Sequence, residues 1–263
     1  MPASLPKIDQ AWFARAQAEG KTCRVTGIES HRVFEYQGLR WLVHEDGSIQ
    51  SIMWRERPDY PVFEYVRGML CALLFHPGPR RILNLGLGAA TLERYLLKHL
   101  PEANLTSVEP DPDIRRLAQE CFDLPDTHPV VRQSAQAYLR HTQETFDIVF
   151  CDIHARPGER DPLQEEAFLD KLGNALAPHG VVTFNLLPVT ERDIVTQLMR
   201  IRQHLPHISL FDVPEQQNLV LFGSREPLPE RETLRKRARG ISLYQSSTAE
   251  SLVEHFIWLP QAR

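Results

Sequence analysis

The sequence has few cysteines, no long hydrophobic run and no recognisable leader at its N-terminus. Its four cysteines are widely spaced and include no Cys-x-x-Cys pair, so we expect neither a disulfide framework nor a metal site. No stretch approaches the ~20 apolar residues that span a membrane. The first residues, MPASLPKIDQAWF, lack the apolar core of a signal peptide. We therefore expect a cytoplasmic protein that does not enter a membrane.

The sequence also lacks an excess of charge of either sign. A net charge of -4 and a pI near 6.3 do not favour a nucleic-acid partner. The basic residues between positions 235 and 239 could form a patch for a nucleic acid or an acidic partner, but the nearby Glu226, Glu230 and Glu232 favour a solvated helix face. A hydrophobic fraction of 42% over 263 residues allows a sizeable core, in one large domain with a small appendage.

The most informative stretch runs from Arg81 to Glu109. It opens with a short apolar run, Ile82 to Leu85, which has the length of a buried strand. A Gly-Leu-Gly turn at residues 86–88 follows, then apolar residues at helical spacing, then a second strand that ends on Glu109. The order of strand, glycine turn, helix, strand and acid predicts the nucleotide-binding half of a doubly wound sheet.

The glycine turn narrows the kind of ligand. Gly86 and Gly88 let the backbone turn sharply and approach a ligand closely, and Glu109 is placed to accept hydrogen bonds from a ribose diol. The dinucleotide fingerprint is incomplete, because Thr91 stands where its last glycine would be, and no Walker-type lysine follows. The loop therefore resembles motif I of class I S-adenosylmethionine (SAM) methyltransferases.

The segment before this stretch has a different character. Glycine turns at 37–38 and 46–47 separate three strand-like runs, which predicts a small antiparallel β module within residues 1–58.

The segment after the stretch completes the predicted sheet. The apolar run Phe146 to Cys151 predicts a buried strand that ends on Asp152. Two last strands, Ile208–Val213 and Asn218–Phe222, are joined by a link too short for a crossover helix, so they should pair antiparallel. We thus predict an α/β, Rossmann-like SAM-methyltransferase fold in residues 59–224, with a mostly parallel sheet and one antiparallel hairpin strand at its C-terminal end. A charged, helical extension should follow at 225–263.

With these motifs placed, residues 24–223 resemble the spermidine synthase (polyamine aminopropyltransferase) family. ILNLGLGAATLERYLLKH is similar to that family's glycine loop and helix, DGSIQ at 46–50 to its hairpin, and FDIVFCDIHARPG to its catalytic strand and loop. The resemblance implies aminopropyl transfer from decarboxylated SAM to a polyamine-like amine, or to another small acceptor. Asp152 would act as the base, because an ammonium must lose a proton before it can attack. It also implies a homodimer through the β module.

The resemblance carries over a set of site residues. For the SAM-type co-substrate, and with no metal, it implies Gly86, Gly88, Glu109, Ser134, Ala135 and Asp152. For the acceptor it implies Gln50, Tyr65 and His154. In a methyltransferase, His154 could serve as acid or base.

Several acidic positions of the family have become neutral in this sequence. Ala89 replaces the aspartate that binds the donor's ammonium, Ser134 the acid that reads adenine, and Ala155 a second loop aspartate; Tyr65 is followed by Val66 and Arg67. Burying a polyamine without carboxylates is unfavourable. Two alternatives to aminopropyl transfer therefore stay open. One is a SAM-dependent methyltransferase, since a neutral Ala89 would not repel the carboxylate of SAM. The other is a non-catalytic nucleoside-binding protein, because a fold does not fix a function.

Overall fold

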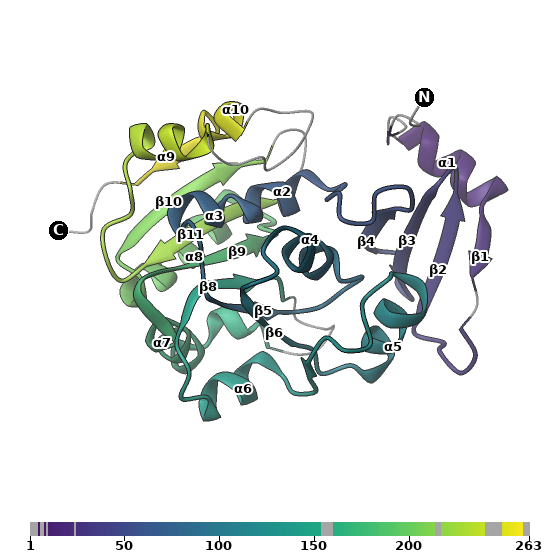
Figure 1. The fold of residues 1–263 in the computed structure, drawn as a ribbon, viewed down its shortest axis with the longest axis horizontal. Coiled ribbons are helices and arrows are strands. Elements are labelled where there is room, and N and C mark those ends of the chain that lie inside the picture. The colour runs from purple at the N-terminus through teal and green to yellow at the C-terminus, as the bar shows by residue number, and fades with distance from the viewer. Residues whose placement is uncertain are drawn as a thin grey trace.

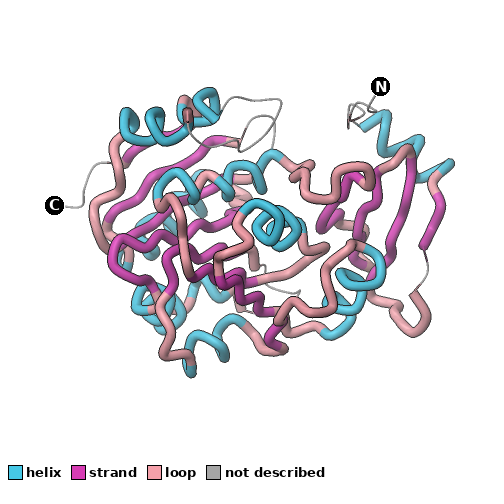
Figure 2. Tube along the Cα trace, viewed as in Figure 1, coloured by secondary structure: helices cyan, strands magenta, loops and turns pink. Residues whose placement is uncertain are grey.

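The computed structural model describes residues 5, 8, 10–23, 25–153, 160–213, 217–239 and 249–259. Over these residues the strands form two sheets, one of four strands and one of eight (Figure 1). Figure 2 shows the same chain by secondary structure, with the small sheet at the N-terminal end of the molecule and the large sheet flanked by helices. The predicted combination of a small antiparallel module and an α/β body is confirmed.

The small sheet is antiparallel and has the strand order β1-β2-β3-β4. Its elements are α1 (Gln10–Glu19), β1 (Lys21–Cys23), β2 (His31–Tyr36), β3 (Leu39–His44) and β4 (Ile49–Trp54). Gly38 and Gly47 take positive φ values in the two tight turns, as the turn signals predicted. Trp12 of α1 packs edge-on against Trp41 of β3, which gives this sheet a core of its own.

The large sheet has the order β12-β10-β11-β9-β8-β5-β6-β7. Its strands are β5 (Arg81–Leu85), β6 (Asn104–Val108), β7 (Val130–Val131), β8 (Phe146–Cys151), β9 (Leu176–Leu186), β10 (His207–Asp212), β11 (Leu219–Ser224) and β12 (Phe256–Trp258). The strands from β7 to β9 are parallel, and β11 pairs antiparallel with both β9 and β10, as predicted. The order and directions are those of a doubly wound sheet closed by one reversed hairpin strand.

Helices cover both faces of this sheet. They are α2 (Glu64–Leu70), α3 (Ala72–Phe75), α4 (Thr91–His99), α6 (Ala135–His141), the 3₁₀ turn η1 (Pro162–Gln164), α7 (Glu166–Asn174), α8 (Glu191–His204), α9 (Arg231–Ala238) and α10 (Ala249–Val253). A further helix, α5 (Pro112–Cys121), packs with the small sheet and the loop after β5. None of the described helices is both long and apolar enough to cross a membrane.

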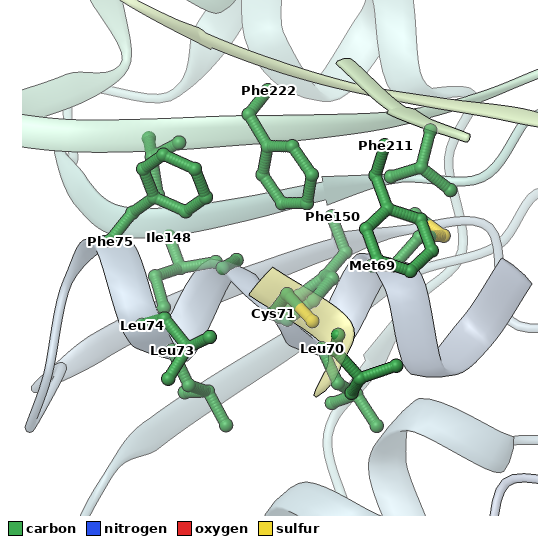
Figure 3. Packing of buried hydrophobic residues seen from close by; sticks show 14 of the residues in the cluster. Met69, Leu70, Cys71, Leu73, Leu74, Phe75, Ile148, Phe150, Phe211 and Phe222 are labelled. Carbon is green, nitrogen blue, oxygen red and sulfur yellow. The ribbon is translucent and has the colours of Figure 1, made fainter. Parts of the chain in front are cut away.

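One face of the large sheet packs against α2, α3, α4, α9 and α10. Figure 3 shows Met69 and Phe75 from the helices lying against Phe150 of β8 and Phe222 of β11. Burying a side chain of this size contributes about 1.5–3 kcal/mol. The alternate residues of the strands, such as Leu83 of β5, face α6 and α7 instead. Strands covered on both faces explain why β5 and β8 are almost continuously apolar.

The C-terminal extension differs in part from the expectation of a helical segment. α9 and α10 are helices, but Phe256–Trp258 forms the strand β12, which pairs antiparallel with β10. The open edge of β10 explains the difference, because its backbone groups need hydrogen-bond partners that a helix would not supply.

Candidate active site

The loop between β5 and α4 turns at Gly86, whose φ is +95°. A Cβ at this position would lie 2.2 Å from the backbone oxygen of Asp152. The Gly86 N–H donates to the Val108 carbonyl at 3.0 Å, and the Asp152 N–H donates to the Leu85 carbonyl at 2.9 Å. The glycine loop and Asp152 are therefore in direct backbone contact, and only glycine fits between them.

Glu109 lies where β6 ends, beside the same loop, and is 9% exposed. One carboxylate oxygen accepts from the Leu87 N–H at 3.1 Å and the other from the Asp111 N–H at 2.9 Å. A hollow of about 210 Å³ opens next to Glu109 and Asp111, and Arg115 and Arg132 also line it. The sequence placed Glu109 next to the glycine loop, and in the structure its carboxylate lies between that loop and this hollow.

The small sheet supplies a third side of the site. Ser51 of β4 accepts a hydrogen bond from the Ala89 N–H at 3.1 Å, and a Cβ on Gly88 would lie 2.8 Å from its Oγ. The sequence pointed to the neighbouring Gln50 instead. Gln50 lies in a β-bulge, where Val43 pairs with Ile49 and Leu42 with Ser51. A contact between two modules leaves no local signal, so Ser51 was not found from the sequence.

Asp152 stands just after β8 and is half-buried. Its Oδ1 accepts from the Asn185 Nδ2 of β9 at 2.9 Å. Tyr65 of α2 hydrogen-bonds to the same carboxylate, and burial together with the negative charge of Asp152 raises the pKa of this phenol well above its usual value. The structure thus joins the predicted residues Tyr65 and Asp152, and it adds Asn185, which sequence patterns did not reveal.

The remaining predicted residues are placed in part. Ser134 caps the N-terminus of α6, where its Oγ accepts from the Ala137 N–H at 3.2 Å, and Ala135 is buried beside it. Both follow β7, which neighbours β6 at the edge of the sheet. Their role in binding adenine stays a prediction. His154 and Ala155 lie outside the described residues.

A buried polar cluster lies beneath the glycine loop. Asn84 of β5 donates from Nδ2 to the Gly86 carbonyl at 2.7 Å and to Glu93 Oε1 at 2.6 Å. Ser107 of β6 donates to the same Glu93 oxygen at 2.6 Å, and His128 hydrogen-bonds to the Ser107 hydroxyl at 2.9 Å. Burial raises the pKa of Glu93 and lowers that of His128, which favours the neutral form of both. The cluster ties the loop to β5 and β6.

Replacing Glu93 by Gln should stabilise the protein at about pH 7.5 and change little near pH 4.5. An unfolded glutamate loses its proton around pH 4.5, whereas folded Glu93 keeps it to higher pH, so the wild type loses folding stability as pH rises through this window. We expect Tm to rise at the higher pH, by roughly 2–4 °C for each kcal/mol of stability gained in a chain of this size. Thermal unfolding of Glu93→Gln at both pH values checks this. The exposed Glu102→Gln serves as control, and an equal shift at both pH values would contradict the prediction.

This sheet order and its reversed strand β11 define a Rossmann-like α/β protein with the class I SAM-methyltransferase fold. The resemblance to the polyamine aminopropyltransferase family is also confirmed. The chain is 28% identical to the polyamine aminopropyltransferase of Chromobacterium violaceum over 223 residues, 81% of this chain and 84% of the relative. It is 27% identical to that of Vibrio vulnificus over 225 residues, 80% of this chain and 73% of the relative. Both relatives are named as aminopropyltransferases, which agrees with the transferase class expected from the sequence. No family model matches the chain.

Solved structures agree on the fold. A probable spermidine synthase from Corynebacterium glutamicum has a TM-score of 0.68 at 20% identity and covers 84% of this chain and 87% of its own. A spermidine synthase in complex with the transition state analogue AdoDATO has a TM-score of 0.66 at 20% identity, and the match covers 91% of this chain and 84% of the synthase. Human methyltransferase-like protein 13 in complex with SAH has a TM-score of 0.62 at 20% identity, and the match covers 76% of this chain and 95% of the human protein.

Proposed function

We propose that this chain is a spermidine synthase-like transferase that binds a SAM-type nucleoside and transfers its aminopropyl group to an amine. The observation that carries the proposal is the contact between Gly86 and Asp152. It puts the backbone of Asp152, an acidic residue, directly beside the loop expected to hold the nucleoside, at the carboxyl ends of the strands where doubly wound folds bind ligands.

The reaction needs one proton acceptor. The amine nitrogen attacks the carbon next to the donor's sulfonium, a C–N bond forms, and the C–S bond breaks with its electron pair going to sulfur. The neutral thioether nucleoside leaves, and the proton released from nitrogen passes to Asp152. Binding donor and acceptor side by side supplies further rate by proximity. In this proposal no metal takes part.

The nucleoside contacts follow from the same geometry. Glu109 would accept from the ribose hydroxyls beside the hollow of about 210 Å³, and Ser134 and Ala135 would lie against the base. Two of the proteins that share this fold were solved with AdoDATO and with SAH, which supports a nucleoside of this class. The acceptor side would include Tyr65, Gln50 and His154. We further propose a cytoplasmic homodimer.

Methyl transfer from SAM is the second candidate, and Ala89 is the observation that favours it. Ala89 is fully buried, carries no charge, and already gives its N–H to Ser51. The loop therefore offers no carboxylate at this position to pair with the ammonium of decarboxylated SAM, and none to repel the carboxylate of SAM. The two donors differ in this group, so their relative affinity separates the two reactions.

Calorimetric titration with SAM and decarboxylated SAM, side by side, tests the proposal. Tighter binding of decarboxylated SAM supports aminopropyl transfer, and tighter binding of SAM moves the assignment to methyl transfer. Glu109→Gln should weaken either ligand by about 10- to 100-fold, because a hydrogen bond to a charged group is worth about 1.5–3 kcal/mol. If neither donor binds at millimolar concentration, both transferase assignments fail. The protein would then have the transferase fold but no transferase activity.

A further inference from the structure

A line of hydrogen bonds reaches Asp152 from two other strands. Asn218, just before β11, donates from Nδ2 to Asn185 Oδ1 at 2.8 Å, and Asn185 donates from its own Nδ2 to Asp152 Oδ1 at 2.9 Å. β11, β9 and β8 are neighbours in the sheet, so the line runs along the edge formed by their ends. Neither asparagine belongs to a motif that the sequence reveals.

The line has a direction. An asparagine side chain could turn either its oxygen or its NH₂ group toward a neighbour, and only the NH₂ group suits a carboxylate. Since Asn218 donates to the Asn185 oxygen, the NH₂ group of Asn185 is the one that faces Asp152. Asn185 is 4% exposed, so water would not readily replace this donor. Asn218 therefore locks the orientation of Asn185.

The opposite element supplies a second donor. Tyr65 of α2 hydrogen-bonds to the Asp152 carboxylate, and Cys151 is the adjacent thiol, whose pKa is raised first by burial and then by Asp152 and Asp161. Asn185 and Tyr65 both restrain the position of the Asp152 carboxylate, because each hydrogen-bonds to it. The carboxylate is thus held from two elements that are far apart in the chain.

We propose that Asn185, whose own orientation is fixed by Asn218, is a positioning residue that holds the Asp152 carboxylate in one orientation for proton transfer. This inference rests on the proposed function, in which Asp152 accepts the proton of the attacking amine. Asn185 itself touches neither reactant in this scheme. It acts through Asp152, so its loss should change turnover and the pH profile, and should leave nucleoside affinity alone.

Asn185→Asp tests this with a side chain of the same shape. It replaces the donor by a second carboxylate against Asp152, and two such groups in contact share a proton at a pH where one alone is ionised. We expect kcat to fall by about 10- to 100-fold, and the acid limb of the pH–rate profile to move to higher pH. The dissociation constant of the nucleoside should stay within about 2-fold of the wild type.

Two further variants complete the design. Asn218→Ala keeps Asn185 but removes the hydrogen bond that orients it. Because Asn218 is only half-buried, the fold should tolerate this change better than a change at Asn185. We expect a fall in kcat of about 3- to 10-fold. Asn174→Asp is the matched control, because Asn174 also donates to a carboxylate, that of Asp170 at 3.2 Å, but on the exposed surface of α7. It should leave kcat and the pH profile unchanged.

The outcomes separate this inference from the proposed function. The inference is supported if kcat falls in Asn185→Asp and Asn218→Ala while both variants still bind the nucleoside. The Asn174→Asp control should keep the wild-type kcat and pH profile. Wild-type kcat and pH profile in Asn185→Asp, alongside an inactive Asp152→Asn, overturn the positioning role and leave the proposed function standing. If the wild type transfers nothing from either donor to any amine of a polyamine panel, the proposed function fails and the inference fails with it.

Discussion

Replacing Asp152 by Asn is expected to lower turnover by about 10²- to 10⁴-fold, the usual contribution of a positioned general base. The amide has the shape of the carboxylate, and its oxygen can still accept from the Asn185 NH₂ group. Fold and nucleoside binding should therefore survive, while the proton of the attacking amine loses its acceptor. Product formation from decarboxylated SAM and an amine panel, with calorimetry on the same samples, measures the two effects separately.

The control for this prediction is Asp170→Asn. Asp170 also accepts from an asparagine amide, that of Asn174, but it lies exposed on α7 away from the glycine loop. We expect wild-type turnover from it. An Asp152→Asn protein that binds the nucleoside and turns over at the wild-type rate would rule out Asp152 as the base, and would leave the fold assignment untouched.

Gly86→Ala should be the most destabilising single change in the site. A Cβ there would lie 2.2 Å from the Asp152 backbone oxygen, and the residue would also have to hold a φ of +95°. Left-handed backbone costs roughly 1–2 kcal/mol for a non-glycine residue, and forcing atoms into a packed region about 1–3 kcal/mol more. We expect a loss of about 2–5 kcal/mol, a fall in Tm of roughly 5–15 °C, and no measurable nucleoside binding.

Gly78→Ala separates the two causes. Gly78 has a φ of +67°, but no atom lies within 4 Å of the Cβ that it would carry. Gly78→Ala should lose only the roughly 1–2 kcal/mol of folding stability that backbone strain costs, and it should bind the nucleoside normally. Equal losses of Tm in the two variants would show that the close approach of the glycine loop to Asp152 is not what requires glycine at position 86.

Much of the site could be predicted because it depends on local patterns. The Gly86 turn and the acid after β8 each follow an apolar run of strand length, and the acid after β6 follows a second strand-length segment. Parallel strands of one sheet bring such ends together. The hairpins at Gly38 and Gly47 could be predicted for the same reason, because their turns need a positive φ and therefore favour glycine at these positions.

The supporting residues were missed because nothing local marks them. Asn84 and Ser107 are ordinary members of short strands, and only the pairing of β5 with β6 and the docking of α4 bring them to Glu93. β12 was missed as well, since a three-residue strand has no periodicity to detect.

The amino-acid sequence alone determined the α/β class, the small β module, the glycine loop and the two acids that border it. These follow from hydrophobic period and turn chemistry, which act over a few residues and are therefore written in the chain. Only the tertiary structure decided what surrounds the reacting group. Asp152 meets Tyr65 from α2 and Asn185 from β9, and the glycine loop meets Ser51 from another sheet. Those contacts depend on strand register and helix docking, which are set by packing over the whole core.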